Sequence, residues 1–131
     1  GDRRSDMVLS GGRNIYPAEV EAALDEHPAV RSSCVIGLPD DDLGQRLHAI
    51  VQTRGELRSE DLVRHLEPLL VRSKIPRSFE FTSDPLRDDA GKLRRQALRE
   101  ARIPKGSSAS PQSSAASGLP ARSEPKANEV Q

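Results

Sequence analysis

The clearest structural signals lie in residues 6–21, whose sequence is DMVLSGGRNIYPAEVE. Apolar residues flank the adjacent glycines Gly11 and Gly12, and glycines between two short apolar runs are typical of the turn of a β-hairpin. We therefore predict two short strands over residues 5–16. Adjacent glycines also let the backbone approach a ligand closely, because glycine has no Cβ and adopts positive φ. An ordinary hairpin turn and a ligand-binding loop both stay open at this point.

The same stretch predicts a helix directly after the hairpin. Pro17 suits the first turn of a helix, because an N–H at that position would have no partner within the helix. Val20 and Leu24 follow at helical spacing, and Pro28 ends the pattern. A helix is therefore expected over residues 17–26.

Apolar alternation and helical spacing place further elements downstream. A leucine stripe predicts a helix that begins at Ser59, an expected N-cap, and Pro68 is expected to kink it. The remaining expected elements are strands over 30–38, 45–53 and 77–82, helices over 59–72 and 92–102, and polar loops over 39–42 and 83–91. This order predicts an α+β fold, in which about three helices pack on a small mixed β-sheet that follows the N-terminal β-hairpin.

Composition limits the chain to one small domain. It has 131 residues, 34% of them hydrophobic and 2% aromatic, and its 20 basic and 20 acidic side chains give no net charge. That balance disfavours a strongly basic nucleic-acid-binding protein. Residues 104–131 are rich in Ser, Pro and Ala and lack periodicity, so we expect a disordered tail there. The folded domain is therefore expected over residues 1–103.

Few residues suggest metal or redox chemistry. The lone cysteine, Cys34, lies in a predicted strand, which favours a buried thiol and a reducing compartment. His27, His48 and His65 lack metal-ligand spacing, so we expect structural or surface roles and no metal site. No apolar run is long enough to span a membrane, and we expect the cytoplasm. Because the sequence begins at Gly1 rather than at Met, we expect a piece of a longer chain.

A second motif, GKLRRQALR, occupies residues 91–99. Lys92 follows a glycine at the end of a polar loop, from which its ammonium can reach a phosphate or a carboxylate. Arg95 and Arg99 lie four residues apart, so they are expected on one face of helix 92–102. Such a charge run is also typical of a solvated helix surface. The residues alone leave open a reactive lysine, a solvated helix, and a stand-alone, non-catalytic module that binds a partner or a polyanion.

Three segments, taken together and in order, resemble one family. They are DMVLSGGRNIYPAEVE, HPAVRSSCVIGLPDDDLGQRLHAIV and DAGKLRRQALR, and the similarity covers residues 2–103. Their order and spacing resemble the C-terminal lid domain of the acyl-CoA synthetases, in the adenylate-forming superfamily. The segment SGGRNIYPAEVE is more similar to fatty- and aryl-acyl-CoA ligases than to peptide-synthetase domains.

This resemblance implies a two-step reaction. ATP, with Mg²⁺, and a carboxylic acid form an acyl-adenylate and pyrophosphate, and coenzyme A then displaces AMP to give a thioester. The small C-terminal domain of the family rotates between the steps and presents one face for each. The resemblance therefore implies that this chain is the catalytic lid of an acid–thiol ligase.

The resemblance also assigns roles to individual residues. Lys92 matches the adenylation lysine, whose ammonium would bridge the substrate carboxylate and the α-phosphate. Gly11 and Gly12 match the loop that lines the pantetheine tunnel, where a side chain would block the path of the thiol. Arg3 matches an arginine near the nucleotide, and Glu19 matches a glutamate for which we expect a structural role.

Several positions lie at the moving parts of the family's lid, and some depart from its pattern. Ser5 stands at the hinge, where the family usually has Asp or Lys, and Asp6 directly follows it. Leu86 replaces a proline, which implies a less rigid lysine loop. Ser73 replaces an aromatic residue, and Pro68 interrupts a helix. These departures imply weaker hinge and coenzyme A contacts, and none of them removes the lysine.

The family's large N-terminal domain holds the ATP-phosphate loop and the acid pocket, and the sequence contains neither. We therefore expect this chain to work with the N-terminal domain of the same enzyme on a small carboxylic acid. ATP and coenzyme A would bind mainly through that domain, and the chain alone would be inactive. No nucleic-acid partner is expected, because no aromatic residue lies near the basic segment to stack on bases.

Overall fold

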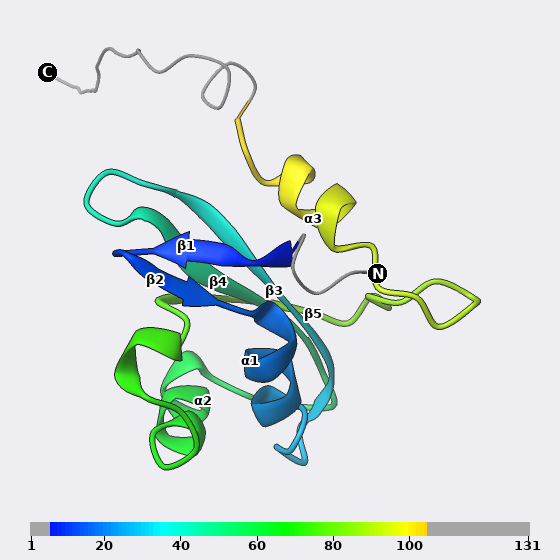
Figure 1. The fold of residues 1–131 in the computed structure, drawn as a ribbon. Helices are drawn as coiled ribbons and strands as arrows, with labels where there is room; N and C mark the ends of the chain where they lie inside the picture. The colour runs from blue at the N-terminus through cyan, green and yellow to red at the C-terminus, as the bar shows by residue number, and fades with distance from the viewer. Residues whose placement is uncertain (1–5, 105–131) are drawn as a thin grey trace, which may run out of the picture. The chain divides into compact units, whose positions relative to one another are not determined.

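The computed structural model describes residues 6–104, so the expectations for Arg3, for Ser5 and for residues 105–131 of the tail lie outside the described residues. The chain divides into two units, residues 1–100 and 101–131, and nearly all of the secondary structure belongs to the first. The elements labelled in Figure 1 are β1 (Val8–Ser10), β2 (Arg13–Ile15), α1 (Pro17–Leu24), β3 (Val30–Asp40), β4 (Gly44–Thr53), α2 (Ser59–Leu66), β5 (Ser78–Thr82) and α3 (Arg95–Ala101). A short 3₁₀ helix, η2 (Arg72–Lys74), lies between α2 and β5.

The N-terminal hairpin forms as predicted. β1 and β2 pair antiparallel, with Val8 opposite Ile15, and both side chains are buried. Gly11 and Gly12 make the turn with φ of 57° and 81°, a backbone region that favours glycine. The Gly11 N–H donates to the carbonyl oxygen of Leu43 at 2.9 Å, which fastens the turn to the loop between β3 and β4. The glycine pair is therefore required by the turn itself.

A three-stranded sheet, ordered β3-β4-β5, forms the centre of the domain. β3 and β4 pair antiparallel across a tight turn, whereas β4 and β5 pair parallel, which makes the sheet mixed. A parallel pair needs a crossover, and α2 and η2 lie in the segment that supplies it (Figure 1). The predicted α+β fold with a small mixed sheet is confirmed.

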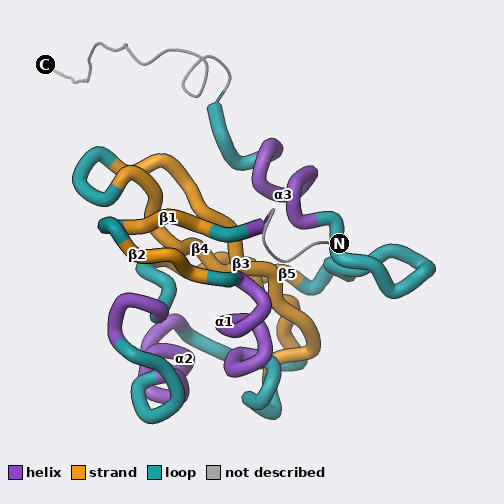
Figure 2. The backbone as a smooth tube through the Cα atoms, viewed as in Figure 1, coloured by secondary structure: helices purple, strands orange, loops and turns teal. Residues whose placement is uncertain are grey.

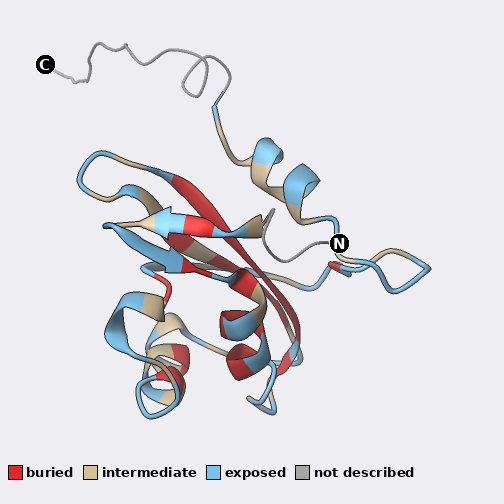
Figure 3. Cartoon of the chain, viewed as in Figure 1, coloured by how far each residue is buried: buried red, intermediate tan, exposed pale blue. Residues whose placement is uncertain are grey.

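The hydrophobic core lies where α1 and α2 pack against the sheet and the hairpin. In Figure 3 buried positions run along the strands and along one side of each of these two helices. Burying such apolar side chains is the main favourable term in folding. The core contains Val8, Ile15, Val20, Ala23, Leu24, Val30, Val35, Leu47, Ala49, Val51, Leu62 and Leu66.

Three predicted boundaries were wrong for local reasons. β3 continues to Asp40, because Pro39 and Asp40 pair with the start of β4 although a loop was expected there. α2 ends at Leu66 instead of residue 72, since Pro68 has no N–H to continue the helical ladder. Ser59 is the first helical residue, and the N-cap is Arg58, whose N–H donates to the Asp61 carboxylate at 3.0 Å.

The predicted start of the third helix was also wrong. α3 begins at Arg95, and Figure 2 draws most of the segment between β5 and α3 as loop. Lys92 therefore lies in this loop rather than in the helix. Leu86 is 8% exposed, and its N–H donates to the side-chain oxygen of Gln52 at 3.4 Å, a bond that a proline could not make.

Candidate functional site

Lys92 lies at the end of a tight turn that we call the lysine turn, residues 87–94. Arg87 and Leu93 form a β-bridge across it, and the Asp88 N–H donates to the Lys92 carbonyl oxygen at 2.9 Å. Gly91, with φ of 79°, donates its N–H to the Asp88 carbonyl oxygen at 2.8 Å. Glycine relieves the strain of that backbone conformation, so the glycine before the lysine is explained by the turn.

The Asp88 carboxylate holds the inside of the lysine turn. Its Oδ1 accepts the N–H of Ala90 at 3.0 Å and that of Lys92 at 2.9 Å, and its Oδ2 accepts Nε–H of Arg94 at 3.0 Å. These bonds favour the charged form, and the Lys92 N–H contributes most to lowering the pKa of Asp88 below its ordinary value. The carboxylate is therefore ionised at neutral pH.

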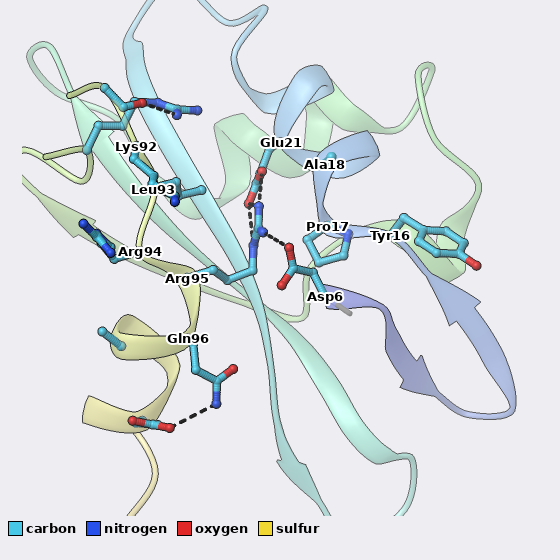
Figure 4. A pocket seen from close by; sticks show the side chains of 14 residues that line it. Asp6, Tyr16, Pro17, Ala18, Glu21, Lys92, Leu93, Arg94, Arg95 and Gln96 are labelled. Carbon is cyan, nitrogen blue, oxygen red and sulfur yellow. Dashed lines mark hydrogen bonds and ion pairs between the residues drawn. The ribbon is translucent and has the colours of Figure 1, made fainter. Parts of the chain in front are cut away.

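Arg95, three residues after the lysine, joins three parts of the chain. Its Nη2 donates to both Glu21 oxygens at 2.7 Å, and its Nη1 donates to Oδ2 of Asp6 at 2.7 Å. Figure 4 shows the guanidinium between the two carboxylates. The second Glu21 oxygen also accepts the N–H of Val35 at 2.8 Å. Arg95 therefore ties α3 to α1 and to Asp6, two residues before β1.

Burial shapes the electrostatics of this network. The Glu21 side chain is 9% exposed and that of Arg95 17%. Loss of hydration raises the pKa of Glu21, and the bonds from Arg95 and Val35 oppose the rise. Arg95 was expected to share a basic helix face with Arg99, and this prediction was wrong, because the Arg95 side chain points inward to Glu21. Arg99 also bonds internally, with Nε–H donated to the Gly37 carbonyl oxygen at 2.7 Å.

A cavity of about 770 Å³ lies between the start of α1 and the lysine turn. Lys92 lines it together with Asp6 and Tyr16, and Figure 4 shows side chains from both segments. Within residues 6–104 no hydrogen bond or ion pair engages the Lys92 ammonium. Lys92 therefore places its ammonium group beside an open cavity, while hydrogen bonds within the lysine turn hold its main chain.

Gly11 belongs to a different cavity, a groove of about 610 Å³ that contains no residue of the first. A Cβ added at Gly11 would stand 3.0 Å from Cδ2 of Leu43, whereas one at Gly12 would meet nothing within 4 Å. The groove is lined by Ser10, Gly11, Arg13, Leu43, Leu47, Val71, Arg72, Ser73, Ile75 and Arg77. Its three arginines were not predicted as site residues: Arg13 comes from β2, whereas Arg72 and Arg77 come from η2 and the segment before β5.

The other residues singled out in the sequence have structural contacts. Both Glu19 oxygens accept from the Lys74 ammonium, at 3.0 and 3.1 Å, which links α1 to η2. His48 bonds to Ser78 and Glu80, and Nε2 of His65 lies 2.7 Å from the Ala23 carbonyl oxygen.

The part of the chain that the structure describes, residues 6–104, contains the lone cysteine. Cys34 is buried there, as expected for a strand residue. Within this range no three His, Cys, Asp or Glu side chains gather to hold a metal ion. No helix in the same range is long and apolar enough to cross a membrane.

Comparison with known proteins agrees with this fold. A family model described as the AMP-binding enzyme C-terminal domain matches residues 19–92, more than half of the chain. The chain belongs to this family. The resemblance to acyl-CoA synthetases deduced from the three sequence segments is confirmed.

The relatives are CoA ligases. A 2-succinylbenzoate–CoA ligase of Bacillus cereus is 41% identical over 99 residues, which cover 76% of this chain and 21% of the relative. Among solved structures, a fatty acyl CoA synthetase of Mycobacterium tuberculosis superposes with a TM-score of 0.72 and 37% identity, over 79% of this chain and 21% of that one. An o-succinylbenzoate CoA synthetase of Bacillus subtilis, in complex with its acyl-adenylate intermediate, superposes with a TM-score of 0.70 and 39% identity over 78% and 21%. The chain thus spans about a fifth of the length of these relatives.

Proposed function

We propose that this chain is the C-terminal lid of an ATP-dependent carboxylic acid–CoA ligase. An oxygen of the acid attacks the α-phosphorus of ATP and expels pyrophosphate. The deprotonated thiol of coenzyme A then attacks the acyl carbon and expels AMP, which leaves acyl-CoA. The observation that carries the proposal is that Lys92 and Gly11 line two cavities with no residue in common. A lid that presents two faces in turn suits two successive steps.

Lys92 would serve the first step. Its ammonium would stabilise the negative charge that builds up between the acid carboxylate and the α-phosphate, a role suited to a preorganised cation. Support comes from the held backbone of the lysine turn and from its place beside the larger cavity. Asp6, the residue after the proposed hinge, lines the same cavity. Mg²⁺ and the bulk of ATP would be held by the partner domain.

Gly11 and Gly12 would serve the second step. A Cβ at Gly11 would stand 3.0 Å from Cδ2 of Leu43, so a side chain there would have to displace the Leu43 side chain that lines the groove. A pantetheine arm needs an open path, and Arg13, Arg72 and Arg77 on the groove would attract the phosphates of coenzyme A. None of these guanidinium groups forms an ion pair with another side chain of the described residues.

The activity would require the N-terminal domain of the same enzyme. The relatives are about five times longer than the matched region, and the phosphate loop and acid pocket are not in this sequence. We expect the 131-residue chain alone to form no acyl-CoA from ATP, coenzyme A and a carboxylic acid. Detectable thioester formation by the purified chain would contradict this. The buried single thiol suits an enzyme of the reducing cytoplasm.

Lys92→Ala in the complete ligase tests the proposal. Loss of a preorganised charge contact costs about 10²–10³-fold in rate, so ATP–pyrophosphate exchange should fall by at least that factor. Thioester formation from supplied acyl-adenylate should stay within about twofold, because the ammonium acts only in the first transition state. Lys74→Ala is the matched control, since Lys74 lines neither of the two cavities. Equal loss of both half-reactions in Lys92→Ala would refute the role.

The alternative of a polyanion-binding module is weakened by the network around Arg95. Two carboxylates already neutralise this arginine, and Arg94 pairs with Asp88. Binding of the chain to a polyanion that weakens steeply with salt would favour the module instead.

A further inference from the structure

We propose that Asp88 is the positioning residue for Lys92, which it serves by fixing the backbone from which the lysine side chain extends. This inference rests on the proposed role of Lys92 in adenylation. It assigns a function to a residue that the sequence motifs do not single out.

The contacts of Asp88 all converge on the lysine turn. The carboxylate accepts from three donors, which belong to Ala90, Lys92 and Arg94. The Asp88 main chain adds two more bonds, from its N–H to Lys92 and from Gly91 to its carbonyl oxygen. One residue therefore contacts four of the six residues that follow it, and Lys92 is held on both its N–H and its carbonyl oxygen.

This arrangement answers a physical need of the reaction. A lysine side chain is a flexible stem with a point charge at its end. Displacement of a reacting group by about 1 Å costs on the order of 100-fold in rate. The stem cannot be fixed by packing in a cavity that must admit substrate, so the position of Lys92 depends on its backbone.

Arg94 explains how a carboxylate can lie so near without cancelling the lysine charge. Oδ2 of Asp88 pairs with Nε of Arg94 at 3.0 Å, and no ion pair joins Asp88 to the Lys92 ammonium in the described part of the chain. Oδ1 is occupied by the two main-chain donors. The negative charge of Asp88 is thus balanced by donors within the turn, and the Lys92 ammonium stays available for substrate.

The test compares Asp88→Ala and Asp88→Asn with Asp89→Ala in the complete ligase. Asp89 is a matched control because it is the adjacent carboxylate and is exposed, and it lines neither cavity. Asp88→Ala should lower ATP–pyrophosphate exchange by about 100-fold with little change in KM, since positioning is lost and binding is not. Asp88→Asn should lose about tenfold, because its amide oxygen still accepts the two N–H groups while its NH₂ opposes Arg94. Thioester formation from supplied acyl-adenylate should be unchanged in all three variants.

A double-mutant cycle separates this inference from the proposed function. If Asp88 acts through Lys92, Asp88→Ala should cause no further loss of residual exchange in the Lys92→Ala background. Full additivity, or equal loss of both half-reactions in Asp88→Asn, would overturn the positioning role. If Lys92→Ala itself leaves exchange intact, the proposed function fails. If Lys92→Ala abolishes exchange and both Asp88 variants retain it, only the inference about Asp88 fails.

Discussion

The turn at Gly11 and Gly12 is closed by main-chain pairing of β1 with β2, whereas the lysine turn combines main-chain bonds with bonds to the carboxylate of Asp88. Both turns contain glycine at positive φ, and both carry residues proposed to act in the reaction. The hairpin turn needs only glycine at its tip and apolar residues on its strands. The lysine turn also uses one particular side chain, the carboxylate of Asp88, which accepts the N–H groups of Ala90 and Lys92.

This difference bears on how each turn can vary. A main-chain ladder does not depend on the identity of the exposed side chains along it, so the hairpin should tolerate changes at its exposed strand positions, but not at its glycines or at the buried Val8 and Ile15. The lysine turn should respond to a single substitution at Asp88 or to its protonation. The two proposed half-reactions would therefore differ in their sensitivity to mutation and to acid.

The largest expected effect concerns Arg95, which directly follows the lysine turn and bonds to Glu21 and Asp6. Arg95→Met leaves the Glu21 carboxylate buried without its partner, which typically costs about 3 kcal/mol of unfolding free energy. Urea unfolding of the chain measures it. Arg94→Met is the control, since the Arg94 side chain is 65% exposed and a surface pair contributes at most about 1 kcal/mol. Equal stability losses in the two variants would mean that Arg95 is no more than a surface contact.

A smaller effect is expected at the hairpin. Gly11→Val places a branched side chain against Leu43 at a φ of +57°, and we expect thioester formation to fall by about 30-fold while ATP–pyrophosphate exchange is kept. Gly55→Ala is the control for strain, because Gly55 has a φ of +105°, meets nothing within 4 Å and lines neither cavity. Loss of ATP–pyrophosphate exchange in Gly11→Val would instead mean that this turn acts in adenylation rather than in thioester formation.

The smallest effect is a difference in response to acid. The pKa of Asp88 is lower in the folded chain than its ordinary value of 3.8, so its contribution to stability is present above 3.8 and is lost as the pH falls through the folded value. NMR titration should therefore shift the Ala90 and Lys92 amide signals below pH 3.8. The Gly11 amide should not follow, because its acceptor is a carbonyl oxygen that does not titrate. Parallel shifts of all three signals would indicate global unfolding instead.

The elements with strong local patterns could be predicted from the sequence. The hairpin, α1 and the strands follow from adjacent glycines, Pro17 and apolar alternation, which are properties of neighbouring residues. The start of α3 could not, because Asp88 captures the main-chain donors of Ala90 and Lys92 in a turn that leaves no periodicity. The helical spacing of the residues after Lys92 therefore led to a predicted start at residue 92, three residues before the observed start at Arg95.

The inward position of Arg95 was missed because its partners are distant in sequence. Glu21 and Asp6 lie 74 and 89 residues away. One signal was available: Glu21 falls at helical spacing from Pro17 and Leu24, on the buried side of α1. A carboxylate on an apolar face requires a buried partner, and an arginine suits it. The arginines of the groove offer no such signal, since Arg13 and Arg77 meet only in the folded chain.

The central claim is that the two turns serve different half-reactions of one ligase. The most direct measurement assays Lys92→Ala and Gly11→Val side by side in the complete enzyme, with ATP–pyrophosphate exchange for the first step and thioester formation from supplied acyl-adenylate for the second. The account predicts a crossed result, in which Lys92→Ala loses the first activity and Gly11→Val loses the second. If both variants lose the same activity, the claim is contradicted.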